Sequence, residues 1–193
     1  MKVISIFNTQ QKFLQRLAKQ DRKAQQELFD QMAPKMLAIC GRYISDEHMA
    51  EDVMLKGFLK VFQKINHFQN QGSLEGWVHR IIVNTCLDHL RGQKKSSFKE
   101  VFTEEIPDTI DFTEESWLDI FTPEIIQNCL NQLPVGCKTV LNLYLFENWK
   151  HQEIAASLNI SEGTSKSQLA HAKKLLKSML LDFANQKAFT QQN

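Results

Sequence analysis

A group of polar side chains follows a predicted bend near residue 160, and their types suit contact with nucleic acid. They recur at helical spacing and are Thr164, Lys166, Ser167, Gln168, His171 and Lys174. Amide and imidazole groups can hydrogen-bond the edges of bases, whereas flexible ammonium groups are better suited to phosphates. The pattern therefore predicts a helix face that reads or holds DNA.

Two short helices joined by a bend are predicted to position these side chains. The buried positions of the first helix and the turn are Ile154, Leu158 and Ile160, and those of the second helix are Leu169, Ala172 and Leu176. Asn159 tolerates the left-handed backbone of a bend, and Ser161 follows as an N-cap. This spacing predicts a helix-turn-helix whose second helix enters the major groove. The alternative is an ordinary helical hairpin with a hydrated polar face.

A second polar surface is predicted about sixty residues upstream, on a loop and the helix after it. The loop runs from Asn66 to Ser73 and contains Phe68 and Gly72, with Ser73 as the cap. In the helix over 74–90 the inward positions are Leu74, Val78, Ile81, Ile82, Cys86 and Leu87, and the outer ones are His79, Arg80, Asn84, Asp88 and Arg91. Aromatic, amide and arginine groups beside a basic tail suit single-stranded nucleic acid. Trp77 and Phe68 are also compatible with simple core packing.

Composition predicts a nearly all-α chain. The 193 residues are 42% hydrophobic, with only 7 Gly and 4 Pro, and alternating β-branched runs are absent. Further helices are predicted from Asp21, with Pro34 as a kink or break, from near Asp46 to Ile65, and from Pro123 onward, with the last helix ending near Leu181. We therefore expect an all-α fold of two small helical domains, the C-terminal one a four-helix domain with the helix-turn-helix.

Charge is distributed unevenly although the net charge is only +1. Residues 1–99 carry 16 basic and 9 acidic side chains, residues 100–122 carry 8 acidic and no basic ones, and residues 123–193 carry 7 basic and 5 acidic ones. The acidic segment is poorly periodic, which favours a flexible linker. Its interspersed apolar residues, such as Phe112 and Trp117, predict a strand that docks on a partner.

Several functional classes are disfavoured by the sequence. The four cysteines, Cys40, Cys86, Cys129 and Cys137, occur singly at apolar helix positions, so we expect buried reduced thiols and no metal site. No secretory signal and no apolar run near twenty residues is evident, which predicts a cytoplasmic protein without membrane insertion. Glycine-rich phosphate loops and catalytic constellations are also missing, so neither a cofactor nor an active site is expected.

Two blocks of this sequence resemble a known family. The block LNQLPVGCKTVLNLYLFENWKHQEIAASLNISEGTSKSQLAHAKKLL resembles the −35-binding domain of extracytoplasmic-function sigma factors. The stretches AEDVMLKGFLKVF and GSLEGWVHRIIVNTCLDHLR resemble their domain for the −10 element and core polymerase. The resemblance implies an N-terminal extension over 1–20, a −10 domain over 21–95, a linker over 96–122, a −35 domain over 123–183 and a tail over 184–193.

The resemblance also implies partners and residue roles. Core RNA polymerase would bind through the clamp helices of its largest subunit and the flap of the second subunit, and the clamp-docking residues would be Asp52, Leu55, Lys56, Phe58, Leu59 and Phe62. Residues for the single-stranded −10 element would be Phe68, Asn70, Gln71, Gly72, Arg80, Asn84 and Arg91, and the polar group after residue 160 would bind duplex −35 DNA. The linker would thread polymerase channels, and an anti-sigma factor is a further candidate partner.

The sequence departs from the family pattern at two places. Leu55-Lys56 stands where the family usually has Gln-Glu, and Gln168, His171 and Lys173 stand where many members carry Arg. Fewer guanidinium groups mean fewer bidentate contacts to guanine, so base preference does not transfer. Two other hypotheses remain open: a DNA-binding regulator that does not join polymerase, and a sigma-derived interaction protein that competes for core polymerase.

Overall fold

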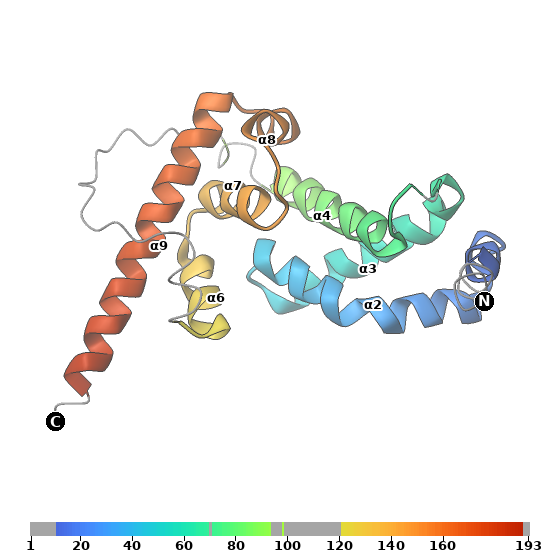
Figure 1. Cartoon of the computed structure of the whole chain (residues 1–193), viewed down its shortest axis with the longest axis horizontal. Coiled ribbons are helices and arrows are strands. Elements are labelled where there is room, and N and C mark those ends of the chain that lie inside the picture. Colours follow the sequence, from blue (N-terminus) through green and yellow to red (C-terminus); the bar gives the residue numbers. More distant parts are fainter. Residues whose placement is uncertain (1–10, 70, 94–97, 99–120, 191–193) are drawn as a thin grey trace, which may run out of the picture. The chain divides into compact units, whose positions relative to one another are not determined.

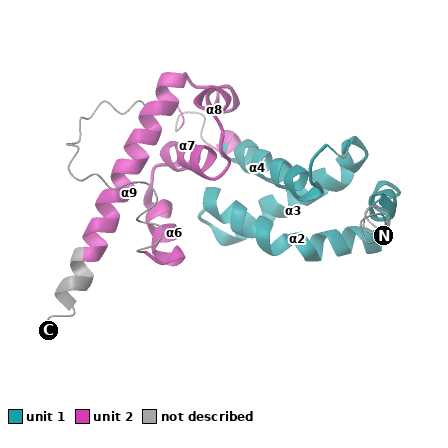
Figure 2. Ribbon diagram, viewed as in Figure 1, with its two compact units in different colours: residues 1–90 teal, residues 91–193 magenta. Residues whose placement is uncertain are grey.

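The computed structural model describes residues 11–69, 71–93, 98 and 121–190, with side chains up to residue 184. The regular elements in these residues are helices (Figure 1). They form two compact units, residues 1–90 and residues 91–193 (Figure 2). The predicted all-α class with two small helical domains is confirmed. Apart from Phe98, Phe121 and Thr122, the predicted acidic linker lies outside the described residues.

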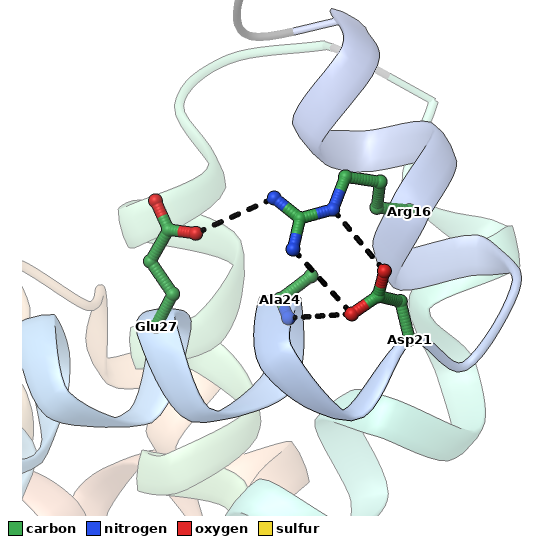
Figure 3. A network of polar contacts seen from close by, with 4 residues as sticks. All are labelled: Arg16, Asp21, Ala24 and Glu27. Carbon is green, nitrogen blue, oxygen red and sulfur yellow. Dashed lines mark hydrogen bonds and ion pairs between the residues drawn. The ribbon is translucent and has the colours of Figure 1, made fainter.

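The first unit begins with a helix over 11–18 that the sequence analysis did not predict. Its Leu17 is 1% exposed, so this segment belongs to the core of the unit. The chain then turns at Gln20, which has a φ of 59°. Arg16 closes the turn through ion pairs with Asp21 (3.2 Å) and Glu27 (3.6 Å), as Figure 3 shows. Hydrogen bonding from Arg16 is the largest cause that lowers the pKa of the Asp21 carboxyl.

Helix α2 (Arg22–Tyr43) starts at the predicted residue, because the Asp21 carboxylate accepts a hydrogen bond from the amide of Ala24 at 3.0 Å. Pro34, predicted as a kink or a break, does not break the helix, which continues through it. A proline inside a helix removes one hydrogen bond. The buried stripe runs on past Pro34 through Met36, Ile39 and Cys40, and its burial offsets that loss.

Helices α3 (Glu47–Lys64) and α4 (Leu74–Gln93) follow, with the short 3-10 turn η1 (Ile65–His67) after α3, and the first unit ends at Leu90 within α4. Asp46 and Ser73 cap the two helices through the amides of Met49 (2.8 Å) and Gly76 (3.0 Å). At Gly57 a Cβ atom would collide with Ile82, so glycine permits the close approach of α3 and α4.

The second unit contains α6 (Pro123–Gln132), α7 (Val135–Leu145), α8 (His151–Leu158) and α9 (Glu162–Thr190). Helix α9 packs on α6, α7 and α8, with its buried stripe centred on Leu169, Ala172 and Leu176 as predicted. It extends beyond its predicted end near Leu181 to Thr190. The residues from 182 to 190 include no proline or glycine, so no strong helix breaker stops the helix there.

Two further predictions concern the cysteines and the membrane. All four cysteines are free and buried, as predicted, and the Sγ atoms of Cys40 and Cys86 lie 3.6 Å apart between α2 and α4. Within the described part of the chain, no helix combines the length and the apolar character needed to cross a bilayer.

Candidate nucleic-acid interface

The bend of the helix-turn-helix has the predicted geometry. Asn159 adopts a left-handed conformation, with φ 54° and ψ 50°, directly after α8. The hydroxyl of Ser161 then accepts a hydrogen bond from the amide of Thr164 at 2.9 Å, which caps α9. Ile154 and Leu158 are buried on the inner face of α8. This combination fixes the direction in which the first turns of α9 leave the bend.

Most of the predicted −35 residues lie at the surface of these turns. Lys166 is exposed, and Thr164, Ser167, His171 and Lys174 are half-buried. The Lys166 ammonium pairs with Glu162 at 2.9 Å, and this hydrogen bond holds the pKa of the Glu162 carboxyl below its ordinary value. The start of α9 therefore presents hydroxyl, imidazole and ammonium groups to solvent.

Gln168 is the exception, and its predicted place on the outer face is wrong. Its side chain is 0% exposed, and its amide Nε2 donates to the carbonyl oxygen of Phe98 at 3.0 Å. Gln168 lies four residues before Ala172 and three after Ser165, both of which are also buried. Helical geometry places these three positions on one face, so the spacing rather than the polarity of the side chain indicated burial.

The predicted −10 surface is in the first unit. Arg80 and Asn84 are exposed on the outer side of α4, and Gln71 and Gly72 are exposed just before this helix. Phe68 and Trp77 are half-buried with ring centroids 5.5 Å apart, so neither ring is a fully buried core residue. Asn70 lies outside the described residues.

Arg91 is the remaining residue predicted to contact the −10 element. It belongs to the second unit, and its guanidinium donates to the carbonyl oxygen of Ser157 at 2.5 Å. This side chain is therefore already engaged by a protein group.

The predicted polymerase-docking face of α3 is exposed with one correction. Asp52, Leu55, Lys56 and Leu59 form a continuous solvent-facing stripe, in which Leu55 is 47% exposed and Leu59 is 60% exposed. Phe58 is only 2% exposed, because it lies on the opposite side of α3 and packs in the core, so it is not part of this face. Phe62 is half-buried at the edge of the stripe.

Comparison with protein families decides what kind of chain this is. A family model for sigma-70 region 2 matches residues 28–96, and one for sigma-70 region 4 matches residues 124–176. The chain belongs to the sigma-70 family. Several similar proteins are named extracytoplasmic-function RNA polymerase sigma factors, and this chain is one of that group.

Individual relatives are distant but span nearly the whole of this sigma factor. The RNA polymerase sigma-H factor of Pseudomonas aeruginosa is 24% identical, over 88% of this chain and 93% of its own length. The sigma-E factor of Haemophilus influenzae is 23% identical, over 89% and 95%. Among solved structures, the sigma factor RpoE from Bartonella quintana, in complex with the anti-sigma factor NepR, shares the fold with a TM-score of 0.50 and 21% identity, over 80% of this chain and 95% of that one.

The sigma factor also has a polar cluster near the bend that the sequence analysis missed. His151, at the start of α8, stacks on Tyr144 with ring centroids 4.9 Å apart, and its Nδ1 lies 2.9 Å from the hydroxyl of Ser165 in α9. Burial, and then the charge of Lys166, lowers the pKa of the His151 imidazole. These residues come from three different helices, so no spacing in the sequence indicated their contact.

Across the described residues, no group of three or more His, Cys, Asp or Glu side chains is arranged to hold a metal ion. The functional groups near the bend are instead donors and acceptors of hydrogen bonds at a helix surface.

Proposed function

We propose that this sigma factor joins core RNA polymerase, recognises the −35 and −10 elements of a promoter and helps to melt the DNA for transcription initiation. The observation that carries the proposal is the polar, solvent-facing start of α9, held by a helix-turn-helix in a chain that also contains sigma-70 region 2. The polymerase would supply the chemistry, and the sigma factor would supply position and specificity.

Duplex −35 DNA would bind to the first turns of α9. Lys166 and Lys174 suit phosphates, whereas His171 and Ser167 lie where a helix in the major groove meets base edges. Gln168 is excluded from this role, because its buried amide is bonded to the Phe98 carbonyl. The Lys166 ammonium is already paired with Glu162, so this carboxylate competes with a phosphate for it.

The −10 element would bind as a single strand to the loop before α4 and to α4 itself. Phe68 and Trp77 offer partly exposed rings on which a flipped base can stack, and the exposed Arg80 suits the backbone phosphates. Extruding a base from the duplex costs a few kcal/mol, so a site that holds it stabilises melted DNA.

Core polymerase would dock on the exposed stripe of α3. Leu55 and Leu59 are large apolar side chains in contact with water, and such patches mark surfaces that bind partners. At Leu55-Lys56, apolar contact with the polymerase would replace the polar contact that the Gln-Glu pair usual in the family would make. An anti-sigma factor is a further candidate partner, since the solved relative was crystallised with one.

In vitro transcription with purified core polymerase on a promoter library tests the proposal. We expect transcripts that start at promoters sharing −35 and −10 motifs, and that depend on this protein. Binding of duplex DNA without core binding would indicate the regulator hypothesis instead. Core binding that blocks transcription by other sigma factors, without transcripts of its own, would indicate the competitor.

A further inference from the structure

A second aromatic and polar surface lies in the first unit, between the start of α2 and the end of α3. A cavity of about 460 Å³ opens to solvent there, and its lining residues are Arg22, Gln25, Gln26, Phe29 and Phe62. We call it the α2–α3 groove. Its volume falls in the range of sites that take small ligands. None of these residues belongs to the −35 or −10 surfaces described above, and Phe62 also lies at the edge of the α3 stripe.

The apolar part of the groove is a fixed aromatic platform. The rings of Phe29 and Phe62 both pack on the buried ring of Phe58, with centroids 4.8 Å and 6.1 Å away. Phe29 and Phe62 themselves are only half-buried, so each ring keeps a solvent-facing part. Bases of single-stranded nucleic acid stack on such exposed rings, and each base contributes about 1–3 kcal/mol.

The cation of the groove is Arg22. Its side chain is exposed, and it makes no hydrogen bond or ion pair within the described part of the chain. The nearby carboxylates of Asp21 and Glu27 are paired with Arg16 instead, as Figure 3 shows. Among the described residues, no acidic side chain lines the groove. The groove therefore favours a negatively charged ligand, such as a phosphate, over a cationic ligand.

The side-chain amides of Gln25 and Gln26 complete the lining, and their oxygen atoms are oriented as hydrogen-bond acceptors. Gln25 donates through Nε2 to the side-chain oxygen of Gln20 at 2.8 Å, and Gln20 donates in turn to the Phe62 carbonyl at 3.0 Å. Gln26 donates through Nε2 to Asp30 at 2.7 Å. These bonds use one N–H of each amide nitrogen and leave the Oε1 atoms of Gln25 and Gln26 as acceptors for a ligand. Adenine, cytosine and guanine carry amino groups that suit these oxygens, whereas thymine offers only its single N3–H.

We propose that the α2–α3 groove binds one unpaired nucleotide of melted promoter DNA, outside the −10 loop. The base packs on Phe29 and Phe62, an amino group of the base donates to Gln25 or Gln26, and Arg22 holds the adjacent phosphate. The net positive charge of residues 1–99 favours the same class of ligand. This inference rests on the proposed function, because promoter melting supplies the single strand.

Oligonucleotide binding by the full chain tests the groove directly. The probes are fluorescent single strands of about twelve nucleotides, all-adenine or all-thymine, measured by anisotropy at several salt concentrations. We expect tighter binding of the adenine strand. Arg22→Gln should weaken it by about five- to thirty-fold and reduce the salt slope by about 0.7, the value for one phosphate contact on a single strand. Phe29→Leu should weaken it by a similar factor without changing the salt slope, because stacking releases no counterion.

Lys23→Gln is the matched control, since Lys23 is exposed on the same turn of α2 but does not line the groove. It removes the same charge and should weaken binding of the adenine strand by less than about twofold. Equal losses in Lys23→Gln and Arg22→Gln would overturn the proposal, because binding would then depend only on general charge. Because Arg22 is exposed, Arg22→Gln should leave the thermal unfolding curve unchanged. The weaker oligonucleotide binding of this variant then does not reflect misfolding.

The same variants separate this inference from the proposed function. Core-polymerase binding and duplex −35 binding should be unchanged in Arg22→Gln and Phe29→Leu. Loss of core binding with intact oligonucleotide binding would make the groove a polymerase contact and overturn the inference. If wild-type protein directs transcription while both variants bind single strands normally, only the groove proposal fails. If wild-type protein supports no transcription yet binds adenine strands through Arg22, the proposed function fails and the groove remains.

Discussion

Helix α3 and the start of α9 each present a face to solvent, and the two differ in which side chains they expose and bury. Helix α3 exposes two leucines, Leu55 at 47% and Leu59 at 60%, whereas α9 buries an amide, with Gln168 at 0%. Helix α7 adds a second case, because Lys138 is 3% exposed. In each case the position on the helix relative to its neighbours, and not the side-chain type, decides burial.

The contrast has a different consequence for each helix. An exposed leucine leaves apolar surface in water, which a partner can cover with a gain of about 25 cal/mol per Å². A buried amide or ammonium must keep hydrogen bonds, and Gln168 and Lys138 do so through Phe98 and Asn131. Substitutions on α3 should therefore affect binding, and those at the two buried polar sites should affect stability.

The largest effect is expected at the α3 stripe. Leu55→Glu should weaken binding to core polymerase at least about 100-fold, because it places an unpaired carboxylate inside the interface. The free energy of unfolding should change by less than about 0.5 kcal/mol, since Leu55 is exposed. Quantitative pull-down and chemical denaturation measure the two quantities.

Lys64→Glu is the control for this substitution, because Lys64 is exposed on the same helix but outside the stripe. It should leave core binding nearly unchanged. Equal losses in both variants would show that general charge, rather than the leucine stripe, governs docking. An unchanged affinity of Leu55→Glu would assign polymerase binding to another face.

A smaller effect is expected at Lys138, whose Nζ donates to the Asn131 side chain at 2.8 Å. Burial lowers the pKa of this lysine from 10.5 to about 8, so the folded state disfavours the charged form. Below pH 8 this cost is present in full, and it disappears as the pH rises towards 10.5. Lys138→Met should therefore raise the free energy of unfolding at pH 7, by at most about 2–3 kcal/mol.

Denaturant unfolding at a series of pH values tests this sign. The stability difference between Lys138→Met and wild type should shrink between pH 8 and 10.5, because wild type gains stability there. The exposed Lys150→Met is the control for loss of one charge. A difference that stays constant over this range would show that the buried ammonium carries no desolvation cost.

Gln168 should give a change in stability without a change in sequence preference. Gln168→Ala removes the hydrogen bond to the Phe98 carbonyl and leaves space beside α9, which should cost about 1–2 kcal/mol of unfolding free energy. Relative affinities for substituted −35 duplexes should stay the same. A selective loss for one base would instead indicate that the amide leaves its buried site and reads DNA.

Local signals explain which parts of this structure could be predicted from the sequence. The caps at Ser73 and Ser161 and the left-handed Asn159 depend on neighbouring residues only, and all three have the predicted geometry. The start of α2 at Asp21 is a local signal of the same kind. Gln168 was placed on the wrong face because its polarity was given more weight than its spacing from Ala172.

Features that depend on the three-dimensional fold could not be predicted in this way. The α2–α3 groove combines Phe62 with residues 22–29, and the cluster of Tyr144, His151 and Ser165 joins three helices. The helix over 11–18 is short, and its one deeply buried residue, Leu17, gives no periodic pattern. In each case the contact arises from tertiary packing, which a spacing rule along the chain does not describe.

The smallest effect is expected at Lys174, a half-buried side chain near the turns of α9 that we propose bind DNA. Its flexible ammonium suits a phosphate, so Lys174→Ala should weaken all duplexes alike by a few-fold and lower the salt slope by about one. His171→Ala should change the preferred bases instead, because an imidazole can hydrogen-bond a base edge. Binding to a panel of substituted −35 duplexes at two salt concentrations distinguishes the roles. A base-selective loss in Lys174→Ala, or a uniform loss in His171→Ala, would reverse this assignment and move the reading face of α9 by one turn.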